Sequence, residues 1–126
     1  MKILVFDKDY DLADALKSLL EFKCHEVKVC NDVVSAISIC KLFNPQLLIS
    51  EYLPSDKNYM HLFKSIYEKN FQTKTMLLTD VCLSLNESTK LQSLGIDCLL
   101  AKPIHPDVII NTVDLFEKSL ERILHH

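Results

Sequence analysis

The sequence predicts an α/β fold in which a parallel sheet is covered by helices on both faces. Five short apolar runs alternate along the chain with five segments whose apolar residues recur at helical spacing. The run from Leu47 to Ile49 is apolar at consecutive positions, as is typical of a strand buried on both faces. With 126 residues, the chain has the length of one domain, which we expect to span residues 1–124. The closing His125 and His126 resemble a purification-tag remnant and carry no functional prediction.

The first strand and helix are marked by a change from apolar to polar residues. Residues 2–6 (KILVF) are β-branched and aromatic, and the polar sequence that starts at Asp7 ends the strand. Asp9 or Asp11 is placed to cap the following helix. The inward face of that helix is expected to carry Leu12, Ala15, Leu16, Leu19 and Leu20.

A second strand, a helix and a third strand follow. Residues 27–30 alternate as a short strand, and Asn31 is expected to cap the next helix. Pro45 closes that helical unit, and the third strand then ends at Glu51. The helix is expected to present Val33, Val34, Ile37 and Cys40 or Lys41 on successive turns.

The second half of the chain repeats this alternation. Gly95 sits where a left-handed residue would end the fourth helix, and Lys102-Pro103 forms a turn before the last helix. The predicted elements are helices at 59–69 and 86–94, a last helix that starts at Asp107, and strands at 75–79 and 98–101. The apolar faces of the third and last helices are expected to carry Met60, Phe63, Ile66 and Tyr67, and Val108, Ile109, Val113, Phe116 and Leu120, respectively.

Composition excludes several classes of protein. The formal net charge is −3, and no run of basic residues favours direct nucleic-acid binding. Apolar runs are too short for a membrane span, and acids follow the N-terminal strand too early for a signal peptide, so we expect a cytoplasmic protein. Five cysteines without CxxC spacing are interpreted as structural core thiols: Cys24, Cys30, Cys40, Cys82 and Cys98.

The candidate site lies where the predicted strands end. Because right-handed crossovers bring the carboxyl ends of parallel strands to one edge, five polar residues are expected to gather there. They are Asp7, Lys8, Glu51, Thr79 and Lys102. The chain has a single glycine and no Gly-rich phosphate-binding loop, which disfavours a flavodoxin-like cofactor binder.

These residues and their surroundings resemble the receiver domain of bacterial two-component response regulators. The matching segments are ILVFDKD, PQLLISEYLP, LLT ending at Thr79, and LGIDCLLAKP. The resemblance spans essentially the whole chain and implies a CheY-like, flavodoxin-like sheet of five strands in the order 2-1-3-4-5, flanked by five helices. It also implies a cytoplasmic role in signal transduction or a phosphorelay.

In that family, a kinase phosphohistidine donates its phosphoryl group to an aspartate after the third strand, with magnesium held by two acids after the first strand. The resemblance places Asp7 at the first of these acids. It places Thr79 and Lys102 at the positions that bind phosphoryl oxygens. It further implies a cis bond between Lys102 and Pro103.

Three positions depart from the family pattern. Lys8 replaces the second acid of the metal pair. Glu51 stands at the phosphoacceptor position, although the spacing to Pro54 would select Ser50 instead. Leu99 replaces the aromatic residue whose rotation reports phosphorylation, and plain core packing is the favoured interpretation of its role.

The departures favour an atypical receiver that works without phosphorylation and is not an enzyme. A lysine beside Asp7 disfavours magnesium, so we expect weak or absent Mg²⁺ binding, with Asp7 and Glu51 as its only ligands. Lys8 is expected to attract Asp7 or Glu51, and a Glu51 that reaches Thr79 or Lys102 would imitate a phosphorylated state. The alternative is a working acceptor domain that uses Glu51, Ser50 or Asp56 with Mg²⁺.

The expected partner is a protein or an output domain, and a homodimer is a further expectation. The resemblance places that contact on the face of the fourth helix, fifth strand and fifth helix. The residues concerned are Lys90, Gln92, Leu99, Ile104, His105 and the outward side of 107–121.

Overall fold

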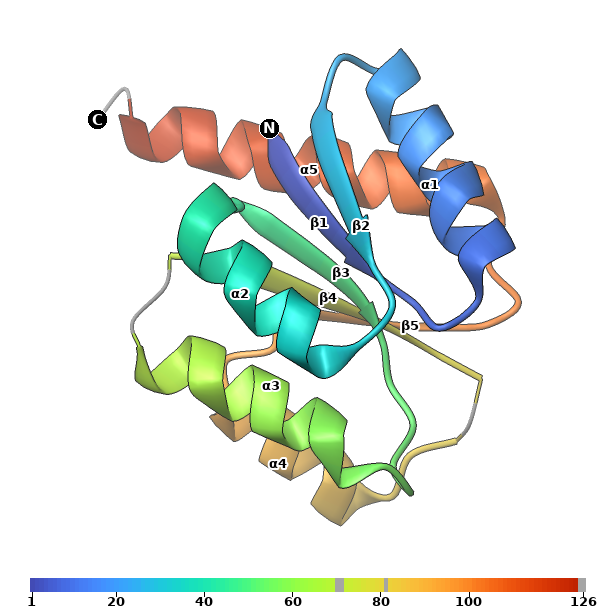
Figure 1. Ribbon diagram of the computed structural model, residues 1–126, viewed down its shortest axis with the longest axis vertical. Helices are drawn as coiled ribbons and strands as arrows, with labels where there is room; N and C mark the ends of the chain where they lie inside the picture. Colours follow the sequence, from blue (N-terminus) through green and yellow to red (C-terminus); the bar gives the residue numbers. More distant parts are fainter. Residues whose placement is uncertain (70–71, 81, 125–126) are drawn as a thin grey trace.

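The structure is a computed structural model that describes residues 1–69, 72–80 and 82–124, and it contains one sheet of five parallel strands (Figure 1). The strands are β1 (Lys2–Phe6), β2 (Glu26–Cys30), β3 (Leu47–Glu51), β4 (Lys74–Thr79) and β5 (Cys98–Ala101). The helices are α1 (Tyr10–Phe22), α2 (Val33–Phe43), α3 (Lys57–Glu68), α4 (Leu85–Ser93) and α5 (Pro106–Leu124). The strand order β2-β1-β3-β4-β5 confirms the predicted fold class. None of the described helices is long and apolar enough to cross a membrane.

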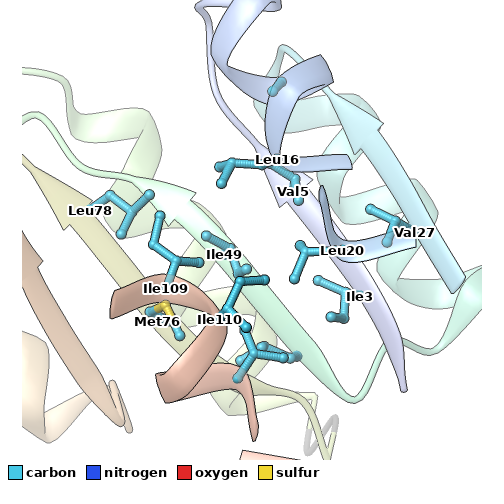
Figure 2. Packing of buried hydrophobic residues seen from close by; sticks show 13 residues of the cluster. Ile3, Val5, Leu16, Leu20, Val27, Ile49, Met76, Leu78, Ile109 and Ile110 are labelled. Carbon is cyan, nitrogen blue, oxygen red and sulfur yellow. The ribbon is translucent and has the colours of Figure 1, made fainter. Parts of the chain in front are cut away.

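Helices cover both faces of the sheet: α1 and α5 lie on one, and α2, α3 and α4 on the other (Figure 1). Alternating side chains of β1 supply both cores, with Ile3 and Val5 on the first face and Leu4 and Phe6 on the second. Figure 2 shows the first core, in which side chains of α1 and α5 pack on those of the strands. Burial on both faces explains why the central strands are apolar at consecutive positions.

Short polar side chains set the starts of α1 and α2. Asp9 caps α1, as one of the two expected candidates. Helix α2 is capped by Asp32, whose Oδ1 accepts a hydrogen bond from the backbone N–H of Ser35 at 2.8 Å, so the expectation for Asn31 is wrong. Asn31 instead donates its Nδ2 hydrogen to the backbone oxygen of Asp7 at 2.8 Å, which ties the end of β2 to the candidate site.

The starts of α4 and α5 also differ from expectation. Helix α4 begins at Leu85, one residue before the predicted start, and is capped by Ser84, because the Ser84 hydroxyl and the Glu87 side chain bond reciprocally to backbone N–H groups. Helix α5 begins at Pro106, one residue before Asp107, since proline suits the first helical position. Two other backbone predictions are confirmed: Gly95 has a left-handed φ of 77°, and the Lys102-Pro103 bond is cis.

Helical phase was the weakest part of the sequence interpretation. Ala15 and Val34, expected inward, are exposed, and so are Tyr67 and Val108. In each helix, apolar residues also occur outside the buried stripe, so hydrophobicity alone does not identify the face that meets the sheet. The buried residues of α1, α3 and α5 are Ala13, Leu16 and Leu20; Tyr59, Leu62, Phe63 and Ile66; and Ile109, Ile110 and Val113.

Strand β5 lies at the edge of the sheet, and its side chains are less buried than those of the other strands. Leu99 is 41% exposed, so the expectation that it packs in the core is wrong. It borders a shallow hollow between β5 and α4 together with Leu91 and Ile96. An aliphatic side chain therefore faces solvent on the surface predicted to meet a partner.

All five cysteines are free, but only two are core residues. Cys30 and Cys40 are buried, and burial raises the pKa of the first thiol to about 12 and of the second to about 11. Cys24 and Cys82 are exposed, which corrects the expectation of core thiols at these positions. The two buried thiols stay protonated at neutral pH and act as small apolar side chains.

At the amino-terminal end of β1, the N-terminal amino group lies between the buried His25 and helix α5. The α-amino group of Met1 lies 2.9 Å from Nδ1 of His25 and 3.3 Å from Oε2 of Glu117 on α5. Burial lowers the pKa of His25 from its ordinary value of 6.5, and the positive amino group lowers it further. Folding therefore favours the neutral imidazole.

We predict that His25 makes the fold less stable as the solution becomes acidic. Below pH 6.5, the unfolded chain binds a proton at this histidine more readily than the folded protein does. The free energy of unfolding therefore decreases as the pH is lowered, until the pH passes below the lowered pKa of the folded state. The His25→Gln variant should lose this component of the pH dependence in urea unfolding between about pH 7 and pH 5. An unchanged slope in the variant would contradict the assignment, and His61→Gln, on exposed α3 surface, is the matched control.

Candidate functional site

Four strands deliver polar residues to the same edge of the sheet. Asp7 directly follows β1, Glu51 ends β3, Thr79 ends β4 and Lys102 directly follows β5. All but Lys102 are buried, and the parallel pairing of these strands brings their ends together. The backbone N–H of Lys102 donates to the Thr79 oxygen at 2.7 Å, which extends the β4–β5 pairing into the site. The predicted juxtaposition is therefore present.

Asp7 is a buried carboxyl group with one cationic neighbour. Its Oδ1 accepts a hydrogen bond from the backbone N–H of Asp9 at 2.8 Å, and its Oδ2 lies 3.5 Å from Nζ of Lys102. Burial raises the pKa of Asp7, and the adjacent Glu51 carboxylate raises it further, whereas the Asp9 N–H and the Lys102 ammonium oppose the change. The net effect is upward, so the site holds its proton more firmly than an exposed aspartate does.

Glu51 is held by two donors. Its Oε1 accepts hydrogen bonds from the backbone N–H of Lys8, at 3.1 Å, and from the hydroxyl of Tyr59. Tyr59 is fully buried on α3 and stacks on Phe6, with 5.5 Å between the ring centroids. Burial and the Glu51 carboxylate both raise the pKa of Tyr59, which keeps its hydroxyl protonated as a donor. The expected contacts of Glu51 with Thr79 or Lys102 are replaced by this pair.

The Lys8 ammonium pairs with Asp56 at the start of α3. Its Nζ lies 2.9 Å from Oδ2 of Asp56 and 5.4 Å from the centroid of the Tyr59 ring. The hydrogen bond to Asp56 raises the pKa of Lys8, and the same bond lowers the pKa of Asp56. The expected attraction to Glu51 is present, because the Glu51 carboxylate also raises the pKa of Lys8, but the direct contact with Glu51 is made by the backbone N–H. Lys8 thus links the turn after β1 to the start of α3.

The two remaining hydroxyl groups near β3 bond to its backbone. Ser50 is fully buried and donates its Oγ hydrogen to the Glu51 carbonyl oxygen at 2.7 Å. Thr79 donates its Oγ1 hydrogen to the Tyr52 carbonyl oxygen at 3.0 Å. Of the two register alternatives, the structure brings Glu51, not Ser50, to the edge beside Asp7. Within the sheet, Ser50 lies between Phe6 of β1 and Leu77 of β4.

The carboxylates that could bind a divalent cation at this edge are already engaged by hydrogen-bond donors. Magnesium prefers six oxygen ligands in near-octahedral geometry, usually with at least one or two carboxylates that have free lone pairs. Here Asp7 and Glu51 already accept hydrogen bonds from N–H and O–H groups, and the next position in the chain is a lysine. Within the described ranges, no three His, Cys, Asp or Glu side chains come close enough to hold a metal ion.

Sequence interpretation missed three residues that shape this site: Tyr59, Asp56 as an ion-pair partner, and Asn31. The sequence does contain a pattern that includes Tyr59. Residues 59, 62, 63 and 66 recur at helical spacing, as do the residues predicted to face the core, 60, 63, 66 and 67. Asp56 was considered only as an acceptor or a turn residue, but it caps α3 through the Asn58 N–H and also binds Lys8. No local pattern indicated the contact of Asn31.

The fold and the edge site together define a doubly wound α/β protein, and comparison with solved structures places it beside CheY-like receiver domains. A two-component response regulator from Clostridium difficile is 24% identical, with a TM-score of 0.82 over 95% of this chain and 98% of its own. A CheY-like receiver domain protein from Methanospirillum hungatei is 23% identical, with a TM-score of 0.80 over 94% of this chain and 97% of its own.

A third neighbour is a longer protein. NtrX from Brucella abortus is 18% identical, with a TM-score of 0.80 over 98% of this chain but only 28% of its own. No protein-family model matches the sequence, and no curated protein matches it either. At these identities the likeness establishes the shared fold, and the function of this chain has to be argued from its own residues.

We predict that the Tyr59 hydroxyl stabilises the folded protein through Glu51. Tyr59→Phe leaves the ring stacked but removes one donor from a buried carboxylate, which should lower the free energy of unfolding by about 1 to 2 kcal/mol. Tyr67→Phe, on the exposed side of the same helix, should change it by less than about 0.5 kcal/mol. Urea unfolding of both variants is the measurement, and equal losses would sink the assignment.

A second prediction concerns the charge on Asp7. Because its pKa is raised in the folded protein, ionisation of Asp7 weakens the fold as the pH rises above the ordinary value of 3.8. The stability of Asp7→Asn relative to the natural protein should therefore improve between about pH 4 and pH 7. Asp14→Asn, on exposed α1 surface, should keep the natural pH profile in the same urea titrations. A relative stability of Asp7→Asn that declines over this range would refute the prediction.

Proposed function

We propose that this chain is a receiver-like module of bacterial two-component signalling that works without phosphorylation and without enzymatic activity of its own. It would act by binding a protein partner, an output domain or a second copy of itself. The shared fold with response-regulator receivers supports the signalling role. The residues at the acceptor position support the proposal that it works without phosphorylation.

The observation that carries the proposal is the state of Glu51. In a phosphoacceptor, one carboxylate oxygen must be accessible and nucleophilic, with a cation placed to neutralise the incoming phosphoryl oxygens. Glu51 is 9% exposed, and its Oε1 is bonded to Tyr59 and to the Lys8 backbone. Bound donors lower the nucleophilicity of a carboxylate, and the buried tyrosine ring lies beside it.

Weak or absent magnesium binding is part of the same proposal. The residue that would complete the metal-binding acids is Lys8, whose ammonium is engaged with Asp56. Asp7, the other acid, is buried, has a raised pKa and pairs with Lys102. A divalent ion would have to displace these contacts and find further oxygen ligands.

The competing acceptors are less suitable than Glu51. The Ser50 hydroxyl is fully buried and already donates to the backbone. Asp56 caps α3 and binds Lys8, so modification there would cost both interactions. Phosphorylation at Glu51, Ser50 or Asp56 with Mg²⁺ is therefore the outcome that the experiment below has to exclude.

The proposed partner surface is the face of α4, β5 and α5. Leu99 on β5 is 41% exposed and Leu85 at the start of α4 is 83% exposed, so apolar area is present without an intramolecular cover. Gln92 is exposed and lines the same hollow as Leu99, whereas Lys90, also exposed, borders residues of α3. His105 is exposed and lies 3.5 Å from the Asp107 carboxylate, which makes it a polar residue at the rim of this face.

The direct test is incubation with acetyl phosphate and Mg²⁺, followed by intact-mass measurement. The natural protein should show no gain of about 80 Da, the mass of one phosphoryl group. Any stoichiometric gain of this mass would refute the proposal; lability at alkaline pH would indicate a carboxylate acceptor, and Glu51→Gln, Ser50→Ala and Asp56→Asn would identify the residue. The double variant Lys8→Asp with Glu51→Asp restores both acidic positions and is expected to gain the phosphoryl group.

A further inference from the structure

A pocket with a volume of about 520 Å³ lies at the carboxyl edge of the sheet, next to the candidate site. Its described lining comes from the first turn of α1, the end of β4, the segment after β5 and the first turn of α5. Small-molecule sites in proteins typically have volumes of roughly 300 to 1,000 Å³. We call this feature the edge pocket, and its lining includes Leu12, Leu78, Asp80, Lys102, Ile104 and Ile109.

Most of these lining residues are apolar, and they continue into the core. Leu78 and Ile109 are buried members of the first core, and Figure 2 shows their side chains next to each other. Leu12 and Ile104 pack against the same core but are only half-buried. Apolar surface is therefore left on these two residues, and a ligand that removed it from water would gain binding free energy.

Lys102 brings a positive charge to the edge pocket. Its side chain is 26% exposed, and its Nζ lies 3.5 Å from Oδ2 of the buried Asp7. An ammonium group has three N–H donors, and in the described part of the chain Asp7 is the only acid within 4.0 Å of this one. Lys102 can therefore keep its contact with Asp7 and still bind a carboxylate in the pocket.

Asp80 brings a negative charge to the same pocket. It directly follows Thr79 at the end of β4, and it is exposed. Among the residues that the structure describes, no cationic side chain forms an ion pair with it at 4.0 Å or less. Its carboxylate is thus available to the ammonium group of a ligand.

We propose that the edge pocket binds a free α-amino acid with an aliphatic or aromatic side chain. The ligand carboxylate pairs with Lys102, its ammonium pairs with Asp80, and its side chain covers Leu12 and Ile104. A ligand with only a carboxylate would bring like charges together at Asp80, and one with only an ammonium would do so at Lys102. A zwitterion with an apolar side chain avoids both conflicts and also uses the apolar wall.

This binding site goes beyond the proposed function, because it requires neither phosphorylation nor its absence. The edge pocket shares Lys102 with the candidate site, so a bound amino acid contacts the group that pairs with the buried Asp7. A small molecule would in this way alter the charge balance at the acidic edge without any covalent change.

The test is titration of the isotope-labelled whole chain with L-leucine and L-phenylalanine, followed by two-dimensional NMR without acetyl phosphate or Mg²⁺. We expect saturable shifts of the Lys102 and Ile104 amide signals at ligand concentrations up to about 20 mM, which covers millimolar Kd values. Signals of α2, on the other face of the sheet, should stay in place. L-Serine, isocaproate and isoamylamine should bind at least about tenfold more weakly than L-leucine, since each lacks one of the three matched groups.

Charge-neutral variants test the two ionic contacts separately. Asp80→Asn should weaken L-leucine binding by about threefold or more, whereas Asp14→Asn, the same change on exposed α1 surface, should alter it by less than about 1.5-fold. Lys102→Gln should weaken it by about tenfold, with exposed Lys118→Gln as the matched control. Because Lys102→Gln leaves Asp7 without its cation, its fold is checked by circular dichroism, and Asp80→Asn decides the question if that variant unfolds.

The proposal fails on any of three results. These are no saturable shift with either amino acid, binding of isocaproate or isoamylamine as tight as that of L-leucine, and equal losses in Asp80→Asn and Asp14→Asn. Phosphorylation of Glu51 in the mass experiment would leave the proposal standing, because the titration is made on the unmodified chain.

Discussion

The site depends on the cost of keeping two acids, Asp7 and Glu51, at one buried edge of the sheet. Parallel topology fixes this proximity, because β1 and β3 are hydrogen-bonded neighbours and end at the same level. Tyr59 and the Lys8 backbone bond to one carboxyl group, and Lys102 and the Asp9 backbone bond to the other. The raised pKa of Asp7 shows that these donors do not fully compensate burial. Keeping the two acids buried therefore lowers the stability of the folded protein at this edge.

Under the proposed function, the same arrangement explains how a receiver-like fold works without phosphoryl transfer to Glu51. Lys8 stands where the resemblance implies an acidic metal ligand, and its side chain binds Asp56 at the start of α3. Tyr59 then supplies from the protein a donor that contacts the acceptor-position carboxylate. Two of the three departures from the pattern of the resembled family, Lys8 and Glu51, thus coincide with internal contacts, whereas Leu99 faces solvent. Such contacts fit the fixed, unphosphorylated centre of the proposed function.

Sequence alone predicted the alternation of elements and the gathering of Asp7, Glu51, Thr79 and Lys102, because strand ends and crossover handedness depend on local pattern and chain topology. It did not predict Tyr59, since the third helix has apolar residues on more than one side and its phase is decided by packing against Phe6. Nor did the sequence indicate which of several nearby acids the Lys8 side chain binds, because that depends on its rotamer in the folded protein.

The segment between β3 and α3 is held by hydrogen bonds at both ends. At its start, Glu51 binds Tyr59 and the backbone of the turn after β1. At its end, Asp56 binds the Lys8 ammonium and the first turn of α3. A switch that exchanges between two shapes needs a loop with two comparable resting positions, and a loop fastened in this way strongly favours one. Under the proposed function, such a domain transmits information through how much of it the cell makes and which proteins it meets. Its regulation would then lie in gene expression and turnover, not in the lifetime of a chemical modification.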